Sequence, residues 1–112
     1  MDKYDPKYVQ PERVDGRLIA TGKLKHGLRI AGSVYQNFVL REALAEDLFI
    51  AEREADVNKP LTYAGELMAL QLVSVGEYKG PFTRGMIGML RQSDFRTLRD
   101  AQAELDVMGE FE

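Results

Sequence analysis

Residues 22–41 show the alternation of apolar and polar side chains that is typical of two β-strands. The apolar residues share one parity on either side of Gly32: Leu24, Leu28, Ile30, Val34, Phe38 and Leu40. A period of two places these side chains on one face of a strand pair. Folding about Gly32 pairs Leu28 with Gln36 and Leu24 with Leu40, and the glycine supplies the positive φ of a three-residue loop. We therefore predict an antiparallel hairpin whose apolar face is covered, because a lone hairpin is not stable in water.

Beyond the hairpin, apolar residues recur at intervals of three and four, which is typical of helices. Four segments show this spacing: about 43–56, 62–75, 83–90 and 94–108. The predicted inner face of the first segment consists of Leu44, Leu48, Ala51 and Ala55. The second segment is apolar almost all round, so we predict that it is the central buried helix and that Leu70 lies in the core. The predicted stripe of the last segment consists of Phe95, Leu98, Ala101, Leu105 and Met108.

These elements predict an α+β fold in which an N-terminal antiparallel β-hairpin packs against a C-terminal bundle of about four helices. A chain of 112 residues has room for one hydrophobic core, and we expect residues 17–112 to form a single domain. Residues 1–16 contain two prolines, mixed charge and few large aliphatic side chains. That composition predicts a flexible N-terminal arm.

The composition limits the chemistry that the protein can perform and the cellular compartment in which we expect it. The chain has no cysteine, which excludes a disulfide framework, a thiolate metal site and a thiol nucleophile. The longest apolar run, residues 67–75, is interrupted by Gln71 and Ser74 and is much shorter than the ~20 residues that span a bilayer. The first residues lack the basic region and apolar stretch of a signal peptide. We therefore expect a protein of the cytoplasm.

Charge is distributed unevenly. Residues 1–41 carry eight basic and four acidic side chains, whereas residues 42–112 carry seven basic and fourteen acidic ones. Binding to nucleic acid needs a surplus of positive charge at the contact, so the acidic remainder of the chain argues against nucleic acid as a partner. A basic ribbon with one aromatic does remain on the hairpin: Lys23, Lys25, Arg29, Arg41 and Tyr35. Such a ribbon could touch nucleic acid, although a solvated face is the more common outcome.

No group of residues supports catalysis or a bound cofactor. His26 is the one histidine, and a catalytic role would require a positioned nucleophile or acid beside it. The segment from Gly16 to Lys23 has five residues between its glycines and Leu24 after the lysine, so it does not match a phosphate-binding loop. We therefore expect that the protein is not an enzyme and binds no cofactor, and that His26 has a structural role.

Two carboxylate pairs have helical spacing, Glu42 with Glu46 and Glu52 with Asp56. Pairs of this kind are common on solvated helix faces, and a hard cation needs convergent carboxylates from another element. We therefore expect no metal site.

The segment that is most suggestive of partner binding contains Phe82, Met86 and Met89. Flexible thioethers on a helix weakened by Gly85 and Gly88 form an adaptable apolar surface that suits a partner helix. The alternative is that these side chains complete the core of a small domain.

The order of elements resembles the tail assembly chaperones of long-tailed bacteriophages, small proteins encoded beside the tape-measure gene. The resemblance covers roughly residues 22–108. A last strand ends in Phe38-Val39-Leu40-Arg41-Glu42, the pair Asp47-Leu48 follows, a long apolar helix comes next, and Leu90, Asp94 and Leu98 form a spaced run. Arg41, Asp47 and Asp94 match the polar signature of that family, and we expect Arg41 to pair with one of the two aspartates. The arm of about sixteen residues departs from the family pattern.

The resemblance implies a function. Members of the family bind the long, apolar, helical tape-measure protein, keep it soluble, and assist the tail-tube protein in assembling around it in the cytoplasm of the bacterial host. They leave before the virion is complete and they have no active site. Many are made in a second, longer form by ribosomal frameshifting, and a homo-oligomer is compatible with the role.

Two other functions stay open at this point. The chain could be a small structural or tail-completion component of the virion, or a nucleic-acid-binding regulator that uses the basic hairpin face. Protein composition of purified particles separates the first from a chaperone, and a salt-dependent gel shift tests the second.

Overall fold

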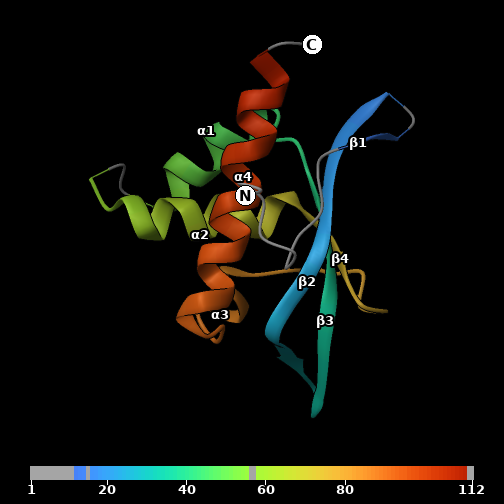
Figure 1. Ribbon diagram of the computed structural model, residues 1–112. Coiled ribbons are helices and arrows are strands. Elements are labelled where there is room, and N and C mark those ends of the chain that lie inside the picture. Colours follow the sequence, from blue (N-terminus) through green and yellow to red (C-terminus); the bar gives the residue numbers. More distant parts are fainter. Residues whose placement is uncertain (1–11, 15, 56–57, 111–112) are drawn as a thin grey trace.

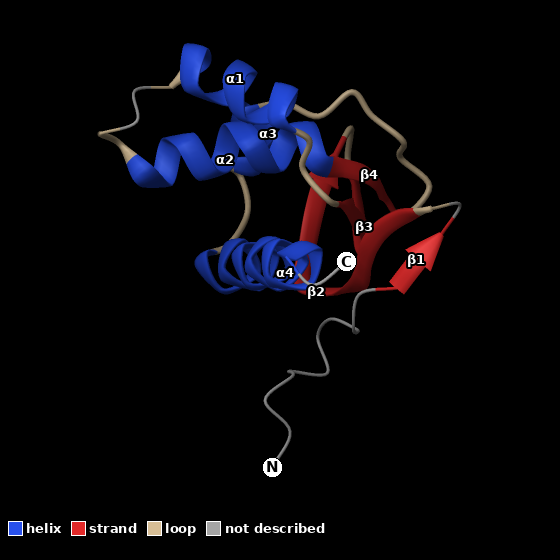
Figure 2. Ribbon diagram, turned by 90° about the horizontal axis from the view of Figure 1, so that it is seen from above, coloured by secondary structure: helices blue, strands red, loops and turns tan. Residues whose placement is uncertain are grey.

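The computed structural model describes residues 12–14, 16–55 and 58–110 and confirms the α+β class. Its elements, in chain order, are β1 (Glu12–Val14), β2 (Arg17–Ile30), β3 (Ser33–Arg41), α1 (Ala45–Glu54), α2 (Pro60–Gln71), β4 (Leu72–Val75), α3 (Arg84–Ile87) and α4 (Gln92–Glu110). The strands form one antiparallel sheet in the order β1-β2-β3-β4. The helices gather on one side of this sheet (Figures 1 and 2).

The hairpin is longer at its start than the sequence predicts. Its first strand begins at Arg17, and residues 12–14 form β1 and pair with β2. The end of the predicted arm is therefore a strand, because its backbone completes the edge of the sheet. Residues 1–11 and 15 lie outside the described residues.

The predicted strand register is wrong. The hairpin turns through Ala31 and Gly32, whose φ values of 51° and 86° suit a two-residue loop, and Ile30 pairs with Ser33. Leu40 pairs with Ala20 instead of Leu24. The ladder is interrupted between Lys23 and Leu28, where four residues of β2 face one residue of β3.

Asp94 of α4 compensates for this interruption. Its carboxylate accepts hydrogen bonds from the backbone N–H groups of Lys25 (2.7 Å), His26 (2.9 Å) and Gly27 (2.9 Å). These donors belong to the residues that have no ladder partner on β3, and a buried donor without an acceptor is costly. Gly27 has a φ of 92°, and a Cβ there would lie 2.6 Å from Val34 Cγ1, so the interruption requires glycine at this position. The bulge and Asp94 therefore form one structural unit.

One hydrophobic cluster joins the inner face of the sheet to α2, α3 and α4. Its buried members are Leu18, Ala20, Leu24, Leu28, Phe38, Leu40, Met68, Leu72, Val75, Ile87, Leu98, Ala101 and Leu105. Each large side chain buried there contributes about 1.5–3 kcal/mol. The stripe predicted for α4 is confirmed, with Phe95 and Met108 half-buried at its ends.

The predicted second helix is too long. It ends at Gln71, and residues 72–75 form β4, which pairs with β3. An apolar run has no period that separates a buried helix from a buried strand, so the free edge of β3 decides the conformation here. The helix is also less buried than predicted: Met68 is fully buried, but Leu70 is only half-buried and Leu61 is 63% exposed.

The orientation of α1 departs most from the prediction. Asp47, Ala51 and Ala55 face the protein, whereas Leu44 is 60% exposed and Leu48 is 41% exposed. The predicted inner stripe is therefore correct only for the alanines. Asp47 faces inward because it pairs with Arg41, and this bond rotates the leucines toward solvent.

Candidate protein-binding groove

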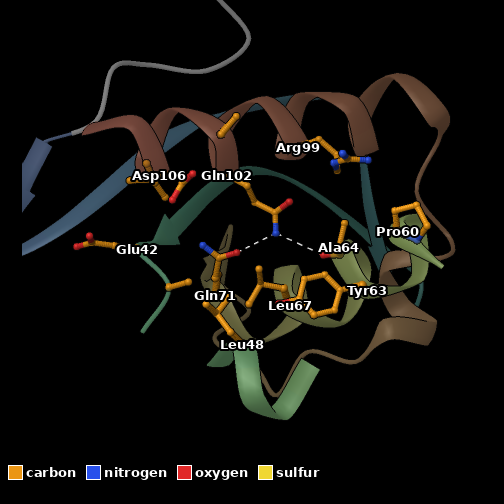
Figure 3. Close-up of a pocket in the computed structure, with 13 residues that line it drawn as sticks. Glu42, Leu48, Pro60, Tyr63, Ala64, Leu67, Gln71, Arg99, Gln102 and Asp106 are labelled. Atoms are coloured by element: carbon orange, nitrogen blue, oxygen red, sulfur yellow. Dashed lines mark hydrogen bonds between the residues drawn. The ribbon is translucent and has the colours of Figure 1, made fainter. Parts of the chain in front are cut away.

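A groove of about 580 Å³ lies between α2 and α4, with part of its lining from α1 and the connection that precedes it (Figure 3). We call this the α2–α4 groove. Its lining consists of Glu42, Ala43, Leu48, Pro60, Tyr63, Ala64, Leu67, Gln71, Arg99, Gln102, Ala103, Leu105 and Asp106. The volume falls within the roughly 300–1,000 Å³ of typical ligand sites.

The apolar side of the groove comes mainly from α2. Tyr63 and Leu67 lie one turn apart on one face of the helix and are half-buried, and Leu48 of α1 lies near them. Opposite them, α4 contributes Ala103, which is exposed and small. A channel between two helices with apolar side chains on one wall suits the face of a third helix, and Ala103 leaves room for it on the α4 wall.

Two glutamines cross the floor of the groove. Gln102 of α4 donates from Nε2 to Gln71 Oε1 (2.8 Å) and to the carbonyl of Ala64 (3.4 Å), as Figure 3 shows. Gln71 in turn donates from Nε2 to the carbonyl of Arg41 (2.9 Å). The polar groups of the floor are therefore hydrogen-bonded. No buried side-chain nitrogen or oxygen among the described residues lacks a partner.

The same network continues to α1 through an ion pair. Arg41 donates from Nη1 to Asp47 Oδ2 (2.7 Å), from Nη2 to Asp47 Oδ1 (3.0 Å) and from Nη2 to the carbonyl of Leu70 (2.9 Å). Asp47 Oδ2 also accepts from the N–H of Leu44 (2.7 Å), which anchors the first turn of α1. β3, α1, α2 and α4 are thus connected through hydrogen bonds beneath the groove.

The guanidinium of Arg41 holds the pKa of Asp47 below its ordinary value, chiefly through the side-chain hydrogen bonds. Burial acts in the opposite direction, and the N–H of Leu44 and the positive charge of Arg41 lower the pKa further. Asp47 is therefore ionised at neutral pH, and the pair is a bidentate, charge-assisted bond.

The two aspartates that match the polar signature of the chaperone family bind different groups. Arg41 pairs with Asp47, one of the two expected pairings, and Asp94 binds the backbone of the β2 bulge instead. All three residues hold helices against the sheet, and none of them lines the α2–α4 groove.

The structure does not bring Phe82, Met86 and Met89 together as one exposed surface. Phe82 and Met86 are half-buried against the core, and Phe82 also packs edge-to-face on Tyr78 at 5.2 Å between ring centroids. Met89 alone is largely exposed, at 74%. A smaller hollow of about 330 Å³ lies between α2, α3 and the start of α4, and none of the three lines it. Their role in partner binding stays a prediction.

Only part of the predicted basic ribbon is exposed. Lys23, Lys25 and Arg29 are exposed on β2, Tyr35 is half-buried, and Arg41 is engaged with Asp47. His26 is exposed at the bulge, where its N–H binds Asp94.

No group of three or more histidine, aspartate or glutamate residues in the described parts of the chain could hold a metal ion. Asp56, one of the carboxylates with helical spacing, lies outside the described residues. Among the described residues, no helix has the length and hydropathy to cross a bilayer.

The groove was missed in the sequence, although one signal for it exists. The segment 62–75 is apolar on more of its circumference than one core can cover, so part of its surface must meet something else. Residues such as Tyr63 and Leu67 occupy that extra arc. The contribution of Leu48 had no sequence signal, because it depends on the inward position of Asp47.

The chain matches no protein-family model, no characterised protein and no solved structure at a significant level.

Proposed function

We propose that this protein is a tail assembly chaperone of a long-tailed bacteriophage and that it binds an apolar helical segment of the tape-measure protein in the α2–α4 groove. The observation that carries the proposal is the groove itself: an open channel of about 580 Å³ between two helices, with apolar side chains on its α2 wall. A chaperone of a long amphipathic helix needs such a channel, because the helix has to bury its apolar face until assembly covers it.

Exposed apolar residues next to the groove support the same role. Leu44, which precedes α1, and Phe49 of α1 are each 60% exposed, and Leu48 of α1 lines the groove. Large apolar groups that gather on one part of a surface are typical of protein-binding sites. The resemblance of Arg41, Asp47, Asp94 and their neighbours to the chaperone family supports the tape-measure protein as the partner.

The test is co-expression with the tape-measure protein of the same phage. We expect the chain to raise the soluble fraction of the tape-measure protein and to bind it stably. Ala103→Trp should abolish both effects, since Ala103 is exposed on the groove wall and an indole there fills the channel. Asp100→Trp is the control, because Asp100 is exposed on the same helix as Ala103 and does not line the groove.

Both variants should keep the helix content and unfolding midpoint of the parent chain. Equal solubility of the tape-measure protein with the parent chain, with Ala103→Trp and with no chain at all would contradict the proposal. Purified virions should lack the protein; its presence there in fixed copy number would identify a structural component instead.

A regulator that binds nucleic acid is the second candidate, and one observation favours it: Lys23, Lys25 and Arg29 are exposed together on β2. A gel shift at low ionic strength that disappears with added salt would support this candidate.

A further inference from the structure

The two ends of the α2–α4 groove carry opposite charge. Arg99 lies at the end where Pro60 is found, and Glu42 and Asp106 lie at the other end (Figure 3). Arg99 and Asp106 are seven positions apart on α4, which corresponds to about two helical turns or ~10 Å. The apolar channel is therefore bounded by a cation on one side and two carboxylates on the other.

The side chains of Arg99, Glu42 and Asp106 make no ion pair with other described residues. The carboxylate of Glu42 lies against the last turns of α4, because a Cβ added to Gly109 would be 2.5 Å from Glu42 Oε2. That position is electrostatically unfavourable, since the carboxyl end of a helix carries partial negative charge and favours cations. The last turn of α4 has no basic residue to offset it.

We infer that the groove selects its helix by charge: it fits an apolar stripe of about two turns with a basic side chain at the Glu42–Asp106 end and an acidic side chain at the Arg99 end. This inference rests on the proposed function, in which a helix of the tape-measure protein occupies the channel. A basic side chain of the partner offsets the two carboxylates and the negative end of α4. A partner helix with two basic or two acidic ends would place a like charge against one end of the groove, and this repulsion weakens binding.

The experiment uses three synthetic helical peptides with one common apolar stripe. They differ at two flanking positions seven residues apart, which carry Glu and Lys, Lys and Lys, or Glu and Glu. Binding to the intact chain is measured by fluorescence anisotropy at about 0.1 M and about 1 M salt, where the Debye lengths are ~10 Å and ~3 Å.

We expect the Glu–Lys peptide to bind about two- to fivefold more tightly than either other peptide at the lower salt concentration, the range of one solvent-accessible ion pair. The preference should vanish at the higher concentration. Arg99→Glu should reverse it, so that the Lys–Lys peptide becomes the tightest ligand. Arg96→Glu changes net charge equally from an exposed position of α4 outside the groove, and it should leave the order unchanged.

Equal binding of the three peptides to the parent chain would overturn the charge selection and leave the groove as a helix site. An identical response to Arg99→Glu and Arg96→Glu would also overturn it, because bulk charge would then explain the preference. Failure of every peptide to bind would overturn the inference as well, while the solubility of the co-expressed tape-measure protein would still decide the proposed function separately.

Discussion

α4 and α1 are both fastened to the rest of the protein by a buried aspartate, yet they bury very different side chains. α4 presents Leu98, Ala101 and Leu105 to the sheet, and all are at most 1% exposed. α1 presents Asp47 and Ala51, whereas its Leu48 and Phe49 and the preceding Leu44 are exposed. Apolar packing therefore holds α4, whereas α1 depends on the Arg41–Asp47 pair.

This difference shows how the protein keeps apolar surface exposed without losing its fold. Polar bonds fix the position of α1 with a side chain that contributes little apolar area. The leucines that would otherwise supply the packing are left for a partner, and the core under α4 supplies the stability. Four predictions test this difference between the two helices.

The largest difference should appear when the same substitution is made in each helix. Leu98→Ala should lower the free energy of unfolding by about 2–5 kcal/mol, because it removes buried contacts and leaves a cavity. Leu48→Ala should lower it by less than about 1 kcal/mol, because Leu48 is already 41% exposed. Urea unfolding of both variants measures the gap. Similar losses at the two positions would show that α1 also contributes to the core.

Asp94→Asn should be the next most damaging change. The amide can replace the carboxylate for only some of the three N–H donors of the β2 bulge, and the charge assistance is lost. We expect a loss of about 2–4 kcal/mol, measured by urea unfolding. Asp100→Asn, an exposed change on the same helix, is the control and should have almost no effect.

Asp47→Asn should cost about 1–3 kcal/mol at neutral pH, since it breaks the bidentate bond to Arg41. The pKa of Asp47 is lowered in the folded protein, so its contribution is complete above the ordinary aspartate pKa and is lost as pH falls through the folded-state pKa. The difference between Asp47→Asn and the parent chain should therefore shrink as pH falls below about 4. A difference that is constant down to pH 2 would contradict the role given to the pair.

The smallest effect on stability should come from Phe49→Ser. Phe49 is 60% exposed, so the free energy of unfolding should change by less than about 0.5 kcal/mol. Capture of the tape-measure protein should weaken if the exposed face of α1 takes part in binding. Unchanged capture would restrict the site to the α2–α4 groove.

The sequence determined the elements that local patterns can encode. Alternation predicted a hairpin between Gly22 and Arg41, and the stripe of α4 predicted which of its residues are buried. These features depend on which face of one element is apolar, and that is written in its own residues.

The tertiary structure alone decided the strand register, the β4 strand, the orientation of α1 and the groove. Leu24 and Leu28 keep the same parity in either register, and the observed one depends on the two-residue turn at Ala31 and Gly32 and on the bulge that Asp94 binds. Residues 72–75 are apolar enough for a helix or a strand, and the open edge of β3 selects the strand. Leu48 is an apolar residue at helical spacing in the sequence, yet it lies in a groove wall because Asp47 takes the inward position. In each case a contact between residues distant in sequence chooses between conformations that the local pattern permits equally.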